Sequence, residues 1–205
     1  MSISDVRNTV IEKYYSLVEK LVKPLAKKGI SPNKISAISL ILALISTLSY
    51  SFGLFFIGGI LLLLSGIMDT IDGTYARIAG RSTRFGALLD STLDRYAEFF
   101  VLFGILFYYR NGIMFFVIIL ILIGSIMTSY IKARAESLGQ KRNVGLMQRP
   151  ERIILLSIGS MLNTTVGNHF PSYEDCIFTG TLILLAVLTN MTAIQRLAAR
   201  KKDLL

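Results

Sequence analysis

The sequence contains one cysteine, one histidine and no tryptophan among its 205 residues. A lone Cys176 excludes an intrachain disulfide and any metal site built from several cysteines. The single His169 lies in a short polar stretch, where we expect a solvated loop residue rather than a ligand. Residues 1–28 lack the apolar core and the small-residue cleavage site of a signal peptide, so we expect the N-terminus to be retained.

Charged residues are also scarce, at 17% of the chain, whereas 53% of the residues are hydrophobic and the formal net charge is +9. This composition is too apolar for a soluble domain of this size and too basic for a neutral membrane plug. It predicts one all-α integral membrane domain with a positively charged surface.

Apolar segments of helical length follow one another along the chain and are separated by short breaks. Six of them are long enough to suggest transmembrane helices, although the fifth is shorter than usual. They cover residues 35–50, 54–72, 84–109, 113–138, 150–162 and 174–196. We therefore expect a bundle of six transmembrane helices in residues 30–205.

Residues 1–29 differ from the segments that follow, because apolar and basic residues alternate at helical spacing. Val10, Tyr14 and Leu17 recur on one face, and lysines supply the basic part of the surface. This pattern predicts an amphipathic helix that lies along an anionic membrane face. A helix packed against its own domain fits the pattern equally well, and the two interpretations are compatible.

The distribution of Lys and Arg indicates the orientation. Twenty of the 22 lie before the first span, in the second connection and the fourth connection with the span ends beside them, and at or after the end of the sixth span. The opposite loops hold only Arg110, and Arg95 lies within the third span. By the positive-inside rule, both termini are expected to be cytoplasmic in a multi-pass protein of the cell membrane.

Four aspartates interrupt the second and third apolar segments. Asp69 and Asp72 are three residues apart, and Asp90 and Asp94 are four apart, so each pair projects from one helix face. Four unpaired carboxylates inside a membrane would cost on the order of 10 kcal/mol. Two carboxylate pairs on neighbouring helices predict a divalent-metal site. The alternative is simple salt bridging to nearby arginines, which does not explain the glycines between the pairs.

The full pattern is Asp69-x-x-Asp72-Gly73-x-x-Ala76-Arg77, eight residues, then Gly86-x-x-x-Asp90-x-x-x-Asp94. It resembles the signature of the CDP-alcohol phosphatidyltransferase family, with eight specified positions over 26 residues. The resemblance implies an enzyme of phospholipid biosynthesis that moves the phosphatidyl-type group of a CDP-linked lipid to an acceptor hydroxyl and releases CMP. It covers residues from about 30 to 200.

The resemblance also implies roles for the residues of the motif. Asp69, Asp72, Asp90 and Asp94 would hold two Mg²⁺ ions, with Mn²⁺ as an alternative, and Asp94 would also act as the catalytic base. The CDP-lipid would lie against small residues and one arginine, namely Gly73, Ala76, Arg77 and Gly86. The family further implies a homodimer, and no nucleic-acid partner is expected.

Basic residues at the cytoplasmic ends of the later spans suggest a phosphorylated acceptor. Within the family, residues 129–136 and 149–152 resemble the branch that makes phosphatidylinositol phosphate or archaetidylinositol phosphate from inositol 1-phosphate. The acceptor phosphate would then be bound by Ser129, Lys132, Arg152 and Arg196. Alternatively, these residues only determine the orientation of the helices in the membrane.

Two other functions fit parts of the sequence. Glycerol 3-phosphate is also a phosphorylated acceptor and would keep the role of every aspartate. A divalent-cation transporter could use the Asp cluster as a transport site, but the cluster is expected at the cytoplasmic end rather than the midplane, and the spans show no inverted repeat.

Overall fold

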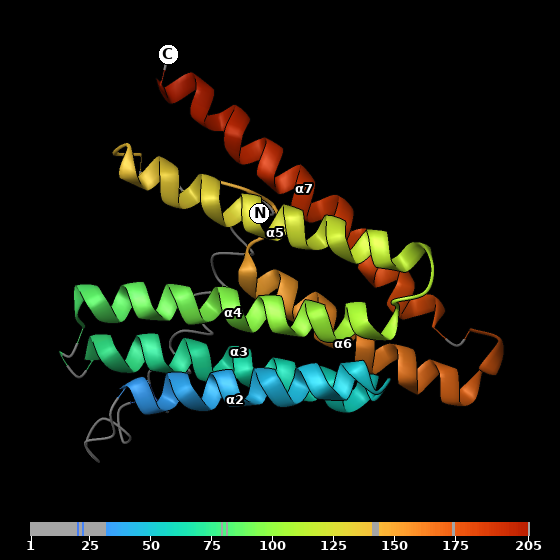
Figure 1. Ribbon diagram of the computed structural model, residues 1–205. Coiled ribbons are helices and arrows are strands. Elements are labelled where there is room, and N and C mark those ends of the chain that lie inside the picture. The colour runs from blue at the N-terminus through green and yellow to red at the C-terminus, as the bar shows by residue number, and fades with distance from the viewer. Residues whose placement is uncertain are drawn as a thin grey trace. The chain divides into compact units, whose positions relative to one another are not determined.

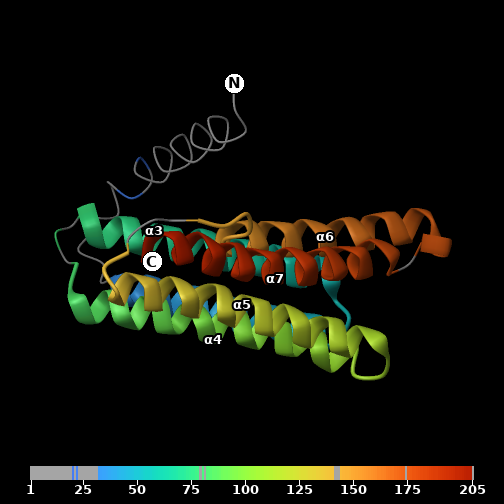
Figure 2. The same cartoon turned by 90° about the horizontal axis from the view of Figure 1, so that it is seen from above.

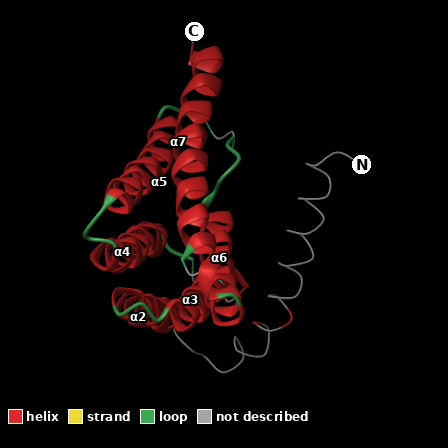
Figure 3. Cartoon of the chain, turned by 90° about the vertical axis from the view of Figure 1, so that its right-hand side faces the viewer, coloured by secondary structure: helices red, strands yellow, loops and turns green. Residues whose placement is uncertain are grey.

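The structure is a computed structural model that describes residues 20, 22, 32–78, 80, 82–140, 144–173 and 175–204. The predicted N-terminal amphipathic helix, except for Lys20 and Val22, lies outside the described residues. The part of the chain that is described forms helices joined by loops, without a strand (Figures 1 and 3). This confirms the all-α prediction. The helices are α2 (Pro32–Ser51), α3 (Phe55–Ile78), α4 (Arg84–Tyr108), α5 (Ile113–Ser137), α6 (Arg149–His169) and α7 (Cys176–Leu204), with a 3-10 turn η1 (Pro171–Tyr173) before α7.

Helices α2, α3, α5 and α7 are long and apolar enough to cross a membrane. Large apolar side chains such as Leu48, Phe116 and Val187 are exposed on them, as expected for helices that face lipid. Helix α4 carries Arg84, Asp90, Asp94, Arg95 and Glu98, and α6 begins with two arginines and a glutamate, so both are more polar. The count of six spans therefore stays a prediction.

The observed helices begin close to the predicted segments, but α3 and α7 end six and eight residues beyond the predicted ends, and α6 also ends later. This helix continues to His169, seven residues beyond the predicted end at Leu162, so His169 is an exposed helical residue rather than a loop residue. The polar run after Leu162 stays helical because Asn163 is buried and accepts a hydrogen bond from the Phe178 backbone N–H. Its amide nitrogen donates to Asp175, so both ends of the side chain are satisfied.

The chain divides into two compact units, each described by itself. The first comprises residues 1–42 and 64–94. In it, α2 and α3 are joined by reciprocal hydrogen bonds, because Ser39 Oγ donates to the Ser65 carbonyl at 2.9 Å and Ser65 Oγ donates to the Ser39 carbonyl at 2.8 Å. A small apolar cluster of Val22, Ile35, Ile71 and Tyr75 lies in the same unit.

The second unit comprises residues 43–63 and 95–205, and its helices approach closely at glycines. Helices α5 and α7 lie side by side (Figures 1 and 2), with Gly124 against Thr189. A Cβ on Gly104 of α4 would overlap the Thr47 carbonyl oxygen of α2. Small residues allow such contacts in membranes, where apolar side chains gain nothing by leaving lipid for a helix interface.

We expect Gly104→Ala to destabilise the protein by about 1–3 kcal/mol, because the added methyl group overlaps backbone that cannot rotate away. The matched control is Gly180→Ala on α7, where a Cβ would meet no described atom within 4 Å. Since alanine also favours helix, the control should leave the melting temperature in detergent unchanged or slightly higher. Equal melting temperatures for the two variants would contradict this packing.

Candidate metal centre

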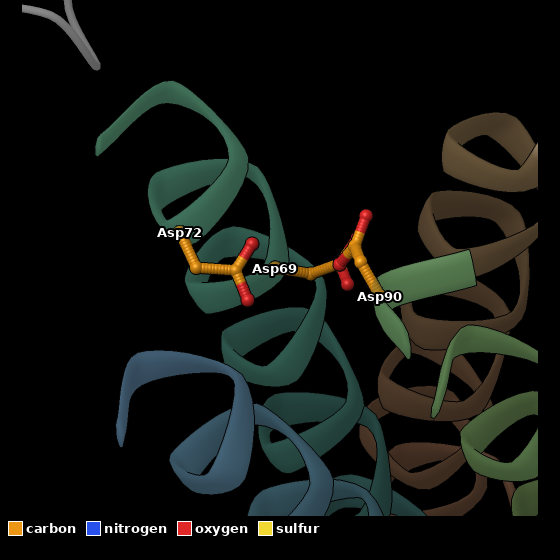
Figure 4. Close-up of side chains that lie close together, drawn as sticks. All are labelled: Asp69, Asp72 and Asp90. Carbon is orange, nitrogen blue, oxygen red and sulfur yellow. The ribbon is translucent and has the colours of Figure 1, made fainter. Parts of the chain in front are cut away.

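Three of the four predicted aspartates come together in the first unit. Asp69 and Asp72 project from α3 and Asp90 projects from α4, and one carboxylate oxygen of each lies within 4.8 Å of the others. Figure 4 shows the three side chains pointing toward one another. The predicted spacing on two neighbouring helices therefore produces a group of carboxylates that could hold a cation.

The turn between α3 and α4 fixes where the two helices end and begin. Gly80 adopts a φ of 62°, and its N–H donates to the Arg77 carbonyl, which closes the end of α3 in the way that favours glycine. Thr83 caps α4, because its Oγ1 accepts a hydrogen bond from the Gly86 N–H at 2.9 Å. These local interactions set the register in which Asp90 reaches the α3 carboxylates.

Asp72 is the most buried member of the group, with 3% of its surface exposed. The Ser36 side chain hydrogen-bonds to its carboxylate, but Oδ2 has no hydrogen-bond partner among the described residues. Two negative charges 4.8 Å apart repel by about 3.5 kcal/mol at an effective dielectric of about 20. A buried, unpartnered oxygen within a group of like charges fits a bound cation, and oxygen-only ligation suits a hard divalent ion.

Asp94 is half-buried on α4, one turn after Asp90, and lies outside the three-residue group. The sequence predicted it as a fourth ligand and as the catalytic base. Both roles stay predictions.

The residues predicted to contact the CDP-lipid lie between Asp72 and Asp90 in the sequence. Gly73 follows Asp72, and a Cβ on it would meet no described atom within 4 Å, so space is open beside the buried carboxylate. Ala76 is half-buried, and Arg77 is exposed with its Nη2 3.3 Å from Thr74 Oγ1. The space beside Gly86 is taken by its own cap, Thr83, rather than by another helix.

The predicted acceptor residues all belong to the second unit. Ser129 is half-buried on α5, and Lys132, one turn on, is exposed and lies 3.9 Å from Glu136. Arg152 is 5% exposed in the first turns of α6 and forms an ion pair with Glu98 of α4. Glu98 is therefore paired with a basic side chain and is not a member of the aspartate group.

Arg196 on α7 is 5% exposed and bound to the main chain. Its Nε donates to the Val144 carbonyl and its Nη1 to the Thr128 carbonyl, both at 2.7 Å. The Met147 N–H donates to Thr192 Oγ1 on the same helix, so residues 144–147 are held against α7. No sequence pattern could have indicated this contact, because both acceptors of Arg196 are backbone carbonyls, which every residue has.

The CDP-alcohol phosphatidyltransferase family model matches residues 29–192. An archaetidylinositol phosphate synthase from Pyrococcus horikoshii is 34% identical, over 91% of this chain and 92% of its own length. The crystal structure of Mycobacterium tuberculosis phosphatidylinositol phosphate synthase with CDP-DAG bound matches with a TM-score of 0.75 and 30% identity, covering 89% of this chain and 92% of that one. The same enzyme in complex with manganese and citrate matches with a TM-score of 0.75 and 29% identity, covering 88% and 87%.

We expect Asp72→Asn to weaken Mn²⁺ binding at least about tenfold, since the substitution removes the charge of the most buried ligand. Electron paramagnetic resonance of Mn²⁺ with the purified protein, without any substrate, measures this directly. Glu136→Gln is the control, because Glu136 is exposed on α5 and outside the group. An unchanged affinity in Asp72→Asn would remove Asp72 from the site.

Proposed function

Since the chain belongs to the CDP-alcohol phosphatidyltransferase family, we propose that it transfers the phosphatidyl-type group of a CDP-linked lipid, CDP-diacylglycerol or CDP-archaeol, to inositol 1-phosphate and releases CMP. The chain is a multi-pass membrane transferase, so the cation-transporter alternative is set aside. The observation that carries the proposal is the group formed by Asp69, Asp72 and Asp90 within the family's motif. The names of the two relatives, which make inositol phosphate lipids, support the acceptor.

Asp69, Asp72 and Asp90 would hold two Mg²⁺ ions, with Mn²⁺ as an alternative and Asp94 touching one of them. When bound, the ions would offset the charge of the diphosphate and of the leaving CMP. The manganese named for the related enzyme supports a divalent ion, and the oxygen-only ligand set supports magnesium. The carboxylates themselves contribute a fixed array of oxygens that needs little rearrangement when the substrate binds.

Asp94 would act as the general base. Its carboxylate would take the proton of the acceptor hydroxyl while that oxygen bonds to the β-phosphorus of the CDP-lipid. The bond between the β-phosphorus and the bridging oxygen then breaks, and the electron pair leaves with CMP.

Gly73, Ala76, Arg77 and Gly86 would form the CDP-lipid site. The open space beside Gly73 supports this, because a diphosphate could approach the backbone next to Asp72 without a clash. Arg77 is exposed at the end of α3, where its guanidinium could pair with a phosphate.

Ser129, Lys132, Arg152 and Arg196 would bind the acceptor phosphate. The buried guanidinium of Arg152 supports this role best, because its orientation is already fixed by a carboxylate. Arg196 would combine phosphate binding with its bonds to the main chain. We also propose that the site and both termini face the cytoplasm at the cell membrane, as the Lys and Arg distribution indicates, and that the enzyme is a homodimer.

The purified protein should release CMP from CDP-lipid only when an acceptor is added. We expect a rate with inositol 1-phosphate at least about tenfold above the rates with glycerol 3-phosphate and free inositol, since free inositol leaves the basic groups unpaired and glycerol 3-phosphate lacks the ring hydroxyls of inositol. The measurement compares CMP release with each acceptor in liposomes. Faster release with glycerol 3-phosphate would assign the enzyme to that acceptor instead.

Asp94→Asn should abolish turnover, with kcat lowered by at least about a hundredfold, because an amide cannot accept the acceptor's proton. Affinity for the CDP-lipid should stay within about threefold, since Asp69, Asp72 and Asp90 remain. Calorimetric titration with the CDP-lipid in Mg²⁺ checks the second statement. Near-normal activity in this variant would remove Asp94 from the role of base.

A further inference from the structure

Glu98 of α4 and Arg152 of α6 form a two-point ion pair in the interior of the second unit. Arg152 Nε donates to Glu98 Oε1 at 2.7 Å, and Nη2 donates to Oε2 at 3.2 Å. The side chains are 6% and 17% exposed. Both carboxylate oxygens are thus occupied by one guanidinium, whose plane is fixed by two nearly parallel hydrogen bonds.

Stability alone is a weak reason for such a pair. Removing two charges from water offsets most of their attraction, and packed apolar residues of similar size often do as well. The exposed Lys132–Glu136 pair on α5 shows the contrast, since its members are 45% and 49% exposed and 3.9 Å apart. The buried pair holds one orientation, whereas the exposed pair adds little order.

Arg152 retains donors after binding Glu98. A guanidinium has five N–H groups, and within the described part of the chain Arg152 uses one on Nε and one on Nη2, both toward Glu98. One N–H of Nη1 and the second N–H of Nη2 therefore point in parallel along the end edge of the planar group. That edge has the geometry for two oxygens of a phosphate.

We infer that Glu98 is a positioning residue, which orients the free edge of the Arg152 guanidinium toward the phosphate of the acceptor. The inference rests on the proposed function and extends it to a residue outside the aspartate motif. Glu98 also offsets the charge of Arg152 before the acceptor binds, so that a guanidinium can remain buried without a ligand. Glu98 itself contacts neither substrate and acts only through Arg152.

The test is Glu98→Gln in the full-length protein in liposomes, with saturating CDP-lipid and varied inositol 1-phosphate. A glutamine retains the shape but accepts only one of the two hydrogen bonds and carries no charge. We expect the acceptor KM to rise about tenfold while kcat and the KM for CDP-lipid stay within about twofold. The control is Asp175→Asn, because Asp175 pairs with Asn163 and belongs to none of the proposed sites, and the acceptor KM of this variant should not change.

A double-mutant cycle with Arg152→Lys separates positioning from general destabilisation. If Glu98 acts through the guanidinium, Glu98→Gln should change the acceptor KM by less than about twofold once Arg152 is lysine. Equal effects in both backgrounds would overturn the inference. So would a lower kcat and melting temperature with an unchanged acceptor KM, because that is the result of a merely structural pair.

Two further results keep the inference separate from the proposed function. If Glu98→Gln does not fold, Glu98→Asp replaces it in the test, because aspartate retains the charge. The acceptor KM of Glu98→Asp should lie between those of the wild type and of Arg152→Lys. If the wild type uses glycerol 3-phosphate instead of inositol 1-phosphate, the inositol proposal fails. The role of Glu98 is then decided by the KM for glycerol 3-phosphate in each variant, relative to the wild type. If the wild type accepts only unphosphorylated polyols, the proposed function and the inference about Glu98 are both overturned.

Discussion

Repulsion among the carboxylates of Asp69, Asp72 and Asp90 is the constraint on which the first unit depends. Three negative charges within 4.8 Å, on helices as apolar as these, require a positive counter-charge. The chain keeps the carboxylates together through neutral interactions, namely the Ser39–Ser65 bonds between α2 and α3 and the Thr83 cap of α4. These interactions add no positive charge, whereas a divalent cation held by the three carboxylates would lower their repulsion.

In the second unit, buried charges are neutralised by an ion pair within the protein. Arg152 and Glu98 neutralise each other directly, through two hydrogen bonds from one guanidinium. The helices around them are held by close contacts at small residues, such as Gly124 against Thr189 and Gly104 against Thr47. This packing suits a membrane, where helix association depends on fit and on polar contacts rather than on the hydrophobic effect. The first unit brings three carboxylates together, and the second holds a guanidinium whose orientation a carboxylate fixes.

Most of the fold could be predicted from the sequence, because apolar segments and their breaks determine where helices of this kind begin and end. The motif also predicted that Asp69, Asp72 and Asp90 would meet, since a three-residue interval places Asp69 and Asp72 on one helix face. The predicted ends of α3, α6 and α7 were too early. For α6 the reason is that the polar Asn163 is satisfied by residues beyond the helix, which no local pattern reveals. The pairing of Glu98 with Arg152 in particular depends on two positions 54 residues apart, and the partner could not be read from either neighbourhood.

The two bonds from Arg196 to main-chain carbonyls limit how the second unit can move. They join α7 to the last turns of α5 through Thr128 and to the segment before α6 through Val144. If α7 slid along its axis by one residue, about 1.5 Å, both bonds would be lost unless the Arg196 side chain reoriented. A shift of α7 is therefore coupled, through one side chain, to both α5 and the segment that leads into α6.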